Sequence, residues 1–265
     1  MVRIAPLLVL VLVLTTIILS WKAFHPAALT LADQVEIATS VLKRARTDRS
    51  VVYDPALNWS ILPKVKNSRQ RKVLFLAKFL PLIAEQNERI LLQRHTAETV
   101  PMGSAEYNAL TNSYRLNSGA SRKALLDRVD RIPESLALAQ AAIESGWGTS
   151  RFAQLGHAYF GERTYDKSIP GMAPLKAKGF TVKKFNSTAA SIRSFMLTIN
   201  SHRAYKGFRR QRAKLRLQNR LASGQELAPY LQAYSEIGSA YTDRILITIK
   251  ANRLDDFDGI QHVDH

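Results

Sequence analysis

The 265-residue sequence contains no cysteine. Without a thiol the chain can form no disulfide, no thiolate metal site and no cysteine nucleophile. Its six histidines have no spacing typical of metal ligands, and the sequence has no phosphate loop, no dinucleotide-binding motif and no Gly-x-Ser-x-Gly motif. These absences exclude several classes of enzyme, and we expect neither a metal nor a cofactor.

Acidic residues are scarce. The sequence contains 21 Asp and Glu but 38 Lys and Arg, which gives a formal net charge of +17. No acid occurs between Lys167 and Gln225, a stretch that holds fourteen basic residues. Eight of them lie in one predicted helical region: Arg203, Lys206, Arg209, Arg210, Arg212, Lys214, Arg216 and Arg220. Such a surface is either a solvated face or a binding site for wall polymer or lipid headgroups. No nucleic-acid-binding motif accompanies the charge, so we expect no nucleic-acid partner.

Only one long apolar run occurs, over residues 4–21, and it is flanked by Arg3 and Lys22. Eighteen residues of helix rise about 27 Å, close to the thickness of a bilayer core. We therefore predict an uncleaved transmembrane anchor over residues 1–21, with a signal peptide cleaved near Ala28 as the alternative. Either interpretation exports the rest of the chain. We expect an inner-membrane protein with its main domain in the periplasm, or a secreted protein.

Apolar spacing predicts a mostly α fold beyond the anchor. We interpret residues 22–69 as a linker or extension with a short helix over 31–46, and residues 70–265 as the main, catalytic domain. Glycine, proline and polar residues predict a loop with one helical turn over 97–120 and a small β-hairpin lobe over 156–185. The predicted helices of the main domain cover residues 71–95, 121–130, 133–145, 187–200, 203–220, 225–235 and 241–253.

The best candidate for chemistry is Glu144, an acidic residue in an apolar helix. It lies at the end of the Leu/Ala-rich segment 133–145, with Ile143 before it and Trp147 three residues later. Burial among apolar groups raises the pKa of a carboxyl group, and an acid still protonated near neutral pH can donate a proton to a glycosidic oxygen. The alternative is a glutamate at an exposed helix end, which caps the helix or pairs with Arg151.

The sequence around Glu144 contains runs of residues that are typical of a known protein family. The most specific runs are residues 128–133 and 141–150, the second of which contains Glu-Ser-Gly-Trp-Gly. Supporting runs follow at Phe160-Gly161, at residues 200–205, and at Tyr234-Ser235 leading to Tyr241. In these runs the sequence resembles the glucosaminidase family of cell-wall hydrolases, which includes the C-terminal domain of the flagellar rod-cap hydrolase. It is most similar to the Bax-like proteins of that family, from about Val73 to Leu254.

This resemblance implies a lysozyme-like α lobe that faces a small β-hairpin lobe. It also implies metal-free hydrolysis of the β-1,4 bond after N-acetylglucosamine in peptidoglycan glycan strands, by a protein that we expect to be a monomer. It places the catalytic acid at Glu144 and a cleft tyrosine at Tyr241. We expect Trp147, Tyr159 and Phe160 to contact the sugar as well, although Tyr159 and Phe160 would fit equally well in the core of the hairpin lobe.

Two positions depart from the family pattern. Ala158 stands where a turn usually has asparagine, and Ala190 stands where the helix after the hairpin usually has an early glutamate. A glycosidase mechanism that uses two carboxyl groups therefore needs its second carboxylate from another position in the chain. Glu162, Asp166 and Asp243 are the candidates, unless the acetamido group of the substrate assists.

Three other functions are also consistent with the sequence. The same fold suits a muramidase or a lytic transglycosylase, which would leave muramic or anhydromuramic ends. The missing acid at Ala190 is consistent with a catalytically weak module that binds the wall without cutting it. A basic, membrane-tethered nucleic-acid binder is the third, and a gel shift at low salt would detect it.

Overall fold

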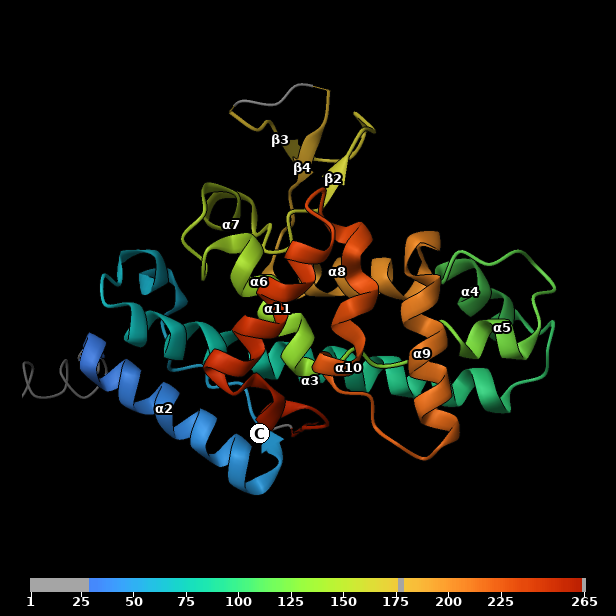
Figure 1. Cartoon of the computed structure of the whole chain (residues 1–265), viewed down its shortest axis with the longest axis horizontal. Coiled ribbons are helices and arrows are strands. Elements are labelled where there is room, and N and C mark those ends of the chain that lie inside the picture. Colours follow the sequence, from blue (N-terminus) through green and yellow to red (C-terminus); the bar gives the residue numbers. More distant parts are fainter. Residues whose placement is uncertain (1–28, 176–178, 264–265) are drawn as a thin grey trace, which may run out of the picture.

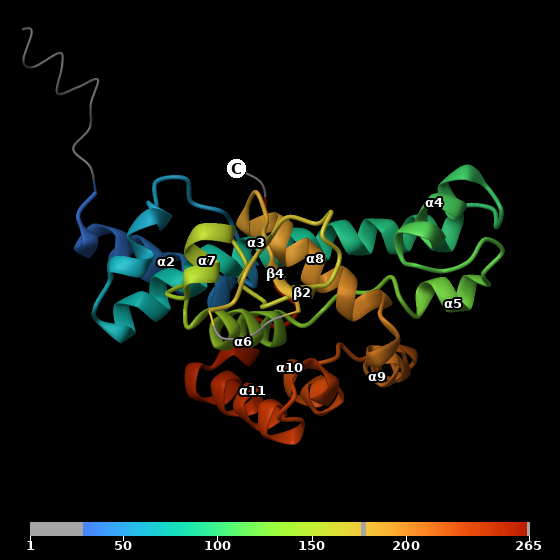
Figure 2. The same ribbon diagram turned by 90° about the horizontal axis from the view of Figure 1, so that it is seen from above.

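The computed structural model describes residues 29–175 and 179–263, and this part is mostly helical. The long helix α3 (Ser68–Thr99) runs through the middle of the molecule (Figures 1 and 2). Helix α6 (Glu134–Ser145) packs against both α3 and α11 (Ser239–Asn252), and nearly all of its residues are buried. The prediction of a mostly α fold with a buried helix over 133–145 is therefore confirmed.

The remaining helices are shorter, and most begin with a side-chain cap. Serine or threonine hydroxyls accept from the free backbone N–H groups of the first turn, as at Thr30, Ser104 and Ser187. The helices are α2 (Leu31–Asp48), α4 (Ala105–Ser113), α5 (Arg122–Leu126), α7 (Arg151–Gly156), α8 (Thr188–Ser201), α9 (Lys206–Leu217) and α10 (Gly224–Leu227). Single 3-10 segments cover Trp59–Lys64, Arg203–Tyr205, Ala228–Tyr234 and Leu254–Phe257.

Several predicted boundaries are wrong. The segment 97–120, expected as a loop with one helical turn, contains the end of α3 and all of the nine-residue helix α4. Ser104 caps α4, and Tyr107 and Thr111 bury one face of it. The helix expected over 225–235 breaks into α10 and a 3-10 segment that has Pro229 in its first turn, where the missing N–H is tolerated. By contrast, α3 continues through Pro81 without ending.

The small β lobe is a three-stranded antiparallel sheet rather than the simple hairpin that we predicted. Its strands are β2 (Arg163–Thr164), β3 (Gly171–Met172) and β4 (Thr181–Lys183), in the spatial order β2-β4-β3. The lobe projects from the helical body at the top of Figure 1, on the side of α7 and α8. The third strand escaped prediction because β3 is only two residues long.

Residues 31–65 pack onto the helical body. Helix α2 lies along α3, and its residues Ala38 and Ala45 belong to the same core as the rest of the chain. Strand β1 (Ser50–Val51) pairs in parallel with β5 (Gln261–His262), which connects this segment to the far end of the chain. The predicted division at residue 69 stays a prediction, and these contacts favour counting residues 31–65 with the helical body.

Within the described residues, no helix is both long enough and apolar enough to cross a bilayer. The predicted anchor over residues 1–21 and the alternative cleavage position at Ala28 lie outside the described residues. Both stay predictions.

Candidate active site

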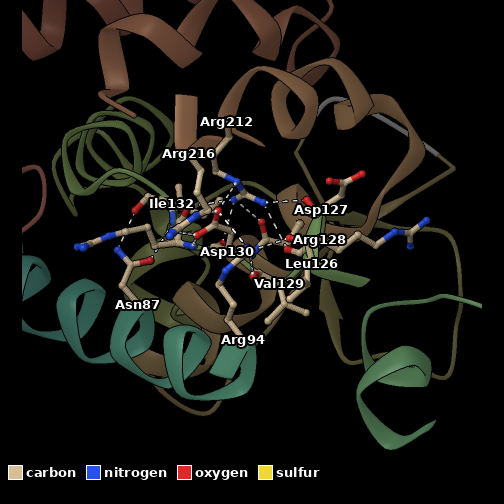
Figure 3. A network of polar contacts seen from close by, with 12 residues as sticks. Asn87, Arg94, Leu126, Asp127, Arg128, Val129, Asp130, Ile132, Arg212 and Arg216 are labelled. Atoms are coloured by element: carbon tan, nitrogen blue, oxygen red, sulfur yellow. Dashed lines mark hydrogen bonds and ion pairs between the residues drawn. The ribbon is translucent and has the colours of Figure 1, made fainter. Parts of the chain in front are cut away.

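The segment before α6 is held by a buried ionic network around Asp130 (Figure 3). Asp130 is only 2% exposed and accepts from Arg216 Nε at 2.6 Å, with Arg94 and Arg212 also close to its carboxylate. Burial by itself raises the pKa of a carboxyl group, but here the three guanidinium groups outweigh burial and hold the pKa of Asp130 below its usual range. Asp130 is therefore a paired, ionised acid.

The same segment is also bound through its backbone. The carbonyl oxygen of Asp130 accepts from Asn200 Nδ2 and from Arg212 Nη1, both at 2.9 Å. On the other side, the Asn87 side chain accepts from the N–H of Ile132 at 2.9 Å and donates to its carbonyl at 2.7 Å. Helices α3, α8 and α9 thus hold the run 128–133 in place. That run, the first of the two specific motifs in the sequence, has a structural role at the start of α6.

The first turn of α6 has no side-chain cap of its own, since Pro133 occupies the cap position. Asp258, more than a hundred residues later, supplies the acceptor: it accepts from Ser135 N at 2.8 Å, from Ser135 Oγ at 2.8 Å and from Gly224 N at 3.0 Å. Burial raises the pKa of Asp258 to about 6, and the nearby charge of Glu134 adds to this effect. The end of the chain therefore closes the N-terminus of α6.

At its other end, α6 stops directly after Glu144 and Ser145. Gly146 has the left-handed conformation, with φ of 57°, and its N–H donates to the carbonyls of Ala142 and Ile143, which is typical of a glycine that ends a helix. Gly148 also has positive φ, and a Cβ there would lie 2.8 Å from a methyl group of Leu62. The two glycines therefore allow a tight turn that leaves Glu144 in the last turn of the helix.

The Glu144 side chain is half-buried and has one hydrogen-bonding neighbour of note, Tyr241. Burial raises the pKa of Glu144, while the hydrogen bond from Tyr241 and the charges of Arg244 and Arg163 oppose this shift only in part. Tyr241 is 2% exposed and accepts from Gln140 Nε2 at 3.1 Å, so α6 and α11 together orient its hydroxyl. The raised pKa agrees with the apolar surroundings that we predicted, whereas the role of Glu144 as the acid stays a prediction.

A groove of about 470 Å³ lies beside Glu144, between the β lobe and the helices. Gly161 connects the two: it lines the groove, and a Cβ on it would lie 3.1 Å from Oε2 of Glu144. The residues that line the groove include Arg115, Glu162, Lys183, Thr198, Tyr205 and Tyr234. The volume is within the range of small-molecule sites. Glu144 itself is not among the lining residues: it is half-buried and lies directly behind Gly161, which lines the groove.

Tyr234, which we did not predict as a site residue, lies at the centre of this arrangement. Its ring stacks on Tyr241 at 5.5 Å between centroids, and its hydroxyl donates to the carbonyl of Phe160 at 2.6 Å. Burial raises the pKa of Tyr234 well above its usual value, and the charges of Tyr241, Glu144 and Glu162 add to this. The only sequence signal for Tyr234 was its place in the family-like run that leads to Tyr241.

Tyr159 and Phe160, predicted as sugar contacts, are core residues in the structure. Phe160 is 1% exposed and stacks face to face on Phe195, with centroids 4.0 Å apart. Tyr159 is also buried, and its hydroxyl accepts from Lys78 Nζ at 3.2 Å. Neither ring has an open face for a sugar, so the alternative of a packing role fits both residues better.

Trp147 packs away from the groove, against α3. Its ring meets Phe75 edge-on at 5.4 Å, and Lys72 Nζ lies 4.9 Å from the ring centroid. Trp147 remains partly exposed, but it is not among the residues that line the groove next to Gly161. Its predicted contact with substrate stays a prediction, and the structure gives it a packing role.

Of the three candidates for a second carboxylate, Glu162 alone lines the groove. Asp166 is exposed and caps the turn at Ser168, and Asp243 is exposed on α11. Ala158 is buried, so a side chain there has no access to the groove in this conformation. Among residues 29–175 and 179–263, no cluster of His, Asp and Glu could hold a metal ion.

Comparison with known protein families matches residues 122–254 to the glucosaminidase family, described as mannosyl-glycoprotein endo-beta-N-acetylglucosaminidase. The matched span contains α6, Glu144 and most of the groove, and it covers half of the chain. The chain therefore belongs to the glucosaminidase family, a family of glycoside hydrolases.

Within that family the chain is Bax-like. It is 31% identical to "Protein bax" of Escherichia coli (strain K12) over 204 residues, which cover 72% of this chain and 73% of the relative. No solved structure matched the chain. The family predicted from the runs around Glu144 is thus confirmed. The family match alone does not identify which glycosidic bond is cleaved.

Proposed function

We propose that this protein is a peptidoglycan hydrolase that cleaves the β-1,4 bond after N-acetylglucosamine, with Glu144 as the general acid. The observation that supports this most directly is the state of Glu144, a half-buried carboxyl with a raised pKa, held against a residue that lines a groove. The family match supports a glycoside-hydrolase reaction. The net charge of +17 suits a substrate that carries carboxylates, such as peptidoglycan.

In this proposal, Glu144 donates its proton to the glycosidic oxygen as the bond to the anomeric carbon breaks. Protonation makes the departing sugar a neutral hydroxyl, which lowers the barrier to bond cleavage. The hydrogen bond from Tyr241 orients the carboxyl group, and Gln140 orients Tyr241 in turn. Arg163 and Arg244 stabilise the carboxylate that remains after the proton has left.

The test is digestion of purified sacculi with the full-length protein in detergent, followed by mass spectrometry of the muropeptides. Products with N-acetylglucosamine at the reducing end are expected. Reducing muramic acid would instead indicate a muramidase, and anhydromuramic ends a lytic transglycosylase. Glu144→Gln should abolish the products, whereas Glu85→Gln, which changes a partly exposed acid on α3 that pairs with Arg89, should not.

A wall-binding module that no longer cuts is the second candidate function, and the alanine at position 190 is what favours it. It predicts that the wild-type protein co-sediments with sacculi without releasing fragments. Release of fragments that depends on Glu144 would exclude it.

For the location, we propose an inner-membrane anchor over residues 1–21 with the hydrolase domain in the periplasm. This rests on the apolar run over residues 4–21 and its basic flanks. Protease added to spheroplasts should digest the domain, and the N-terminus should remain with the membrane fraction. A protein that starts after Ala28 in the soluble fraction would contradict the anchor.

A further inference from the structure

The two carboxylate oxygens of Glu162 have different surroundings. Oε2 accepts three hydrogen bonds: from Lys183 Nζ at 3.0 Å, from Ser194 Oγ at 2.9 Å and from Thr198 Oγ1 at 3.4 Å. Oε1 is buried, and among the described residues it has no hydrogen-bond partner. Leaving a buried acceptor without a hydrogen bond is unfavourable. Among the described residues three donors meet one oxygen and none meets the other, so Oε1 is the oxygen left to accept a hydrogen bond from a bound molecule.

The position of Glu162 suggests which molecule that is. Glu162 follows Gly161 directly, and it lines the same groove, with a side chain only 7% exposed. Gly161 is the residue against which Oε2 of Glu144 lies. The charges of both glutamates also act on Tyr234, which lines the groove as well. Glu162 therefore lines the groove at the start of the β lobe, and Glu144, at the end of α6, lies against the residue that directly precedes Glu162.

We propose that Glu162 is the second carboxylate of this site, and that its Oε1 accepts a proton from the attacking water. The inference rests on the proposed function, since it supplies the base that the reaction needs. The water oxygen bonds to the anomeric carbon as the bond from that carbon to the glycosidic oxygen breaks. The departing oxygen takes the proton of Glu144, and Glu162 takes a proton from the water. One water is consumed, and a proton passing from Glu162 to Glu144 through solvent restores both groups.

Each partner of Oε2 has a defined part in this arrangement. Ser194 and Thr198 are four residues apart on α8, so they lie on the same face of the helix and both reach Glu162. Lys183, on β4, ties the β lobe to the same carboxylate. Together they hold the carboxylate plane so that Oε1 is the oxygen left for the water. A base that activates water directly predicts inversion at the anomeric carbon.

Azide separates this role from a structural one. In Glu162→Ala, kcat on sacculi should fall by about 10²- to 10⁴-fold, the usual contribution of a general base. Sodium azide needs no deprotonation, so it should restore turnover and leave an azide on the new reducing end, visible as a mass shift in the muropeptides. Asp166→Ala is the matched control, because Asp166 is an exposed acid in the same lobe, and it should leave kcat unchanged.

Two results would overturn the role of Glu162. One is a Glu162→Ala protein that keeps kcat within about threefold of the wild type. The other is a loss of kcat that azide does not restore, accompanied by a lower melting temperature, which would mean that Glu162 only supports the fold. In either case an inactive Glu144→Gln leaves the proposed function intact. An active Glu144→Gln would refute the proposed function itself, whatever Glu162 does.

Discussion

Two acids lie near opposite ends of α6, and their surroundings shift their pKa values in opposite directions. Asp130, just before the helix, is almost fully buried and has its pKa lowered by Arg94, Arg212 and Arg216. Glu144, in the last turn, has its pKa raised by burial, which Tyr241, Arg244 and Arg163 oppose only in part. Burial acts on both in the same direction, so the difference comes from pairing. A buried acid that is paired with cations stabilises the fold, whereas a buried acid with few partners can donate its proton.

The comparison also shows how a helix can hold a reactive acid in place. Asp130, Asn87 and Asp258 bond the start of α6 to α3, α9 and the end of the chain. The opposite end can then carry a carboxyl that contributes little to stability. We expect substitutions at the first end to change stability, and substitutions at the second end to change activity.

The largest effect is expected from Glu144→Gln. The glutamine side chain has the same shape as glutamate and can still accept a hydrogen bond from Tyr241, but it cannot donate a proton to the glycosidic oxygen. We expect kcat/KM on sacculi to fall by about 10²- to 10⁴-fold, with no loss of melting temperature at pH 7. A variant that stays within tenfold of the wild type would show that Glu144 is not the acid.

Asp130→Asn should be the most destabilising of these substitutions. It leaves Arg212, itself only 3% exposed, beside a neutral amide, and removing one partner of a buried charge pair costs about 3–5 kcal/mol. Urea unfolding would measure the change in the free energy of unfolding. The matched control is Asp127→Asn, because Asp127 pairs only with the exposed Lys123 and should change stability by less than about 1 kcal/mol. An equal loss of unfolding free energy in Asp130→Asn and Asp127→Asn would contradict the claim that the paired, buried Asp130 stabilises the fold.

Asp258→Asn should destabilise the protein by about 1–3 kcal/mol at pH 7, because an amide nitrogen would face one of the three donors that now meet the carboxylate. The pH dependence gives a second readout. The folded pKa of about 6 lies above the usual 3.8, so the folded state holds the proton more tightly than the unfolded state. This carboxyl therefore lowers wild-type stability as pH rises from about 4 to 6, and the variant should lack that decline. Asp255→Asn, at an exposed acid, should retain it.

The smallest effect concerns the stability of Glu144→Gln as a function of pH. Because burial raises the folded pKa of Glu144, ionising this group disfavours the folded state. The penalty is absent at pH 4 and present at pH 8. The variant should therefore melt at a higher temperature than the wild type at pH 8, and the gap should close at pH 4. A variant less stable than the wild type at pH 8 would mean that Glu144 is stabilised by its neighbours.

The sequence predicted those features that depend on local spacing. The Leu/Ala pattern predicted the buried helix α6 over residues 133–145. The pairing of β1 with β5 joins residues more than two hundred positions apart, and no local pattern signals it. Helix α4 was missed because its polar surroundings resemble those of a loop.

The candidate site was predicted in part, for the same reason. Glu144 stood out as an acid among apolar neighbours, whereas Phe160 and Tyr159 could equally have lined a groove or filled a core. Which of Glu162, Asp166 and Asp243 faces the groove depends on how the β lobe meets α8, and so on tertiary contacts. The role of the run 128–133 also became clear only from its partners in α3 and α9.

The most direct test of the account is the pKa of Glu144, measured by following its carboxyl carbon by NMR as the pH changes. Protein labelled with ¹³C at glutamate and aspartate carboxyls would be titrated, and the loss of a signal in Glu144→Gln would assign it. We predict a midpoint above the usual 4.5 for Glu144 and one below 3.8 for Asp130. A Glu144 midpoint at or below 4.5 would contradict the claim that burial raises the pKa of this acid.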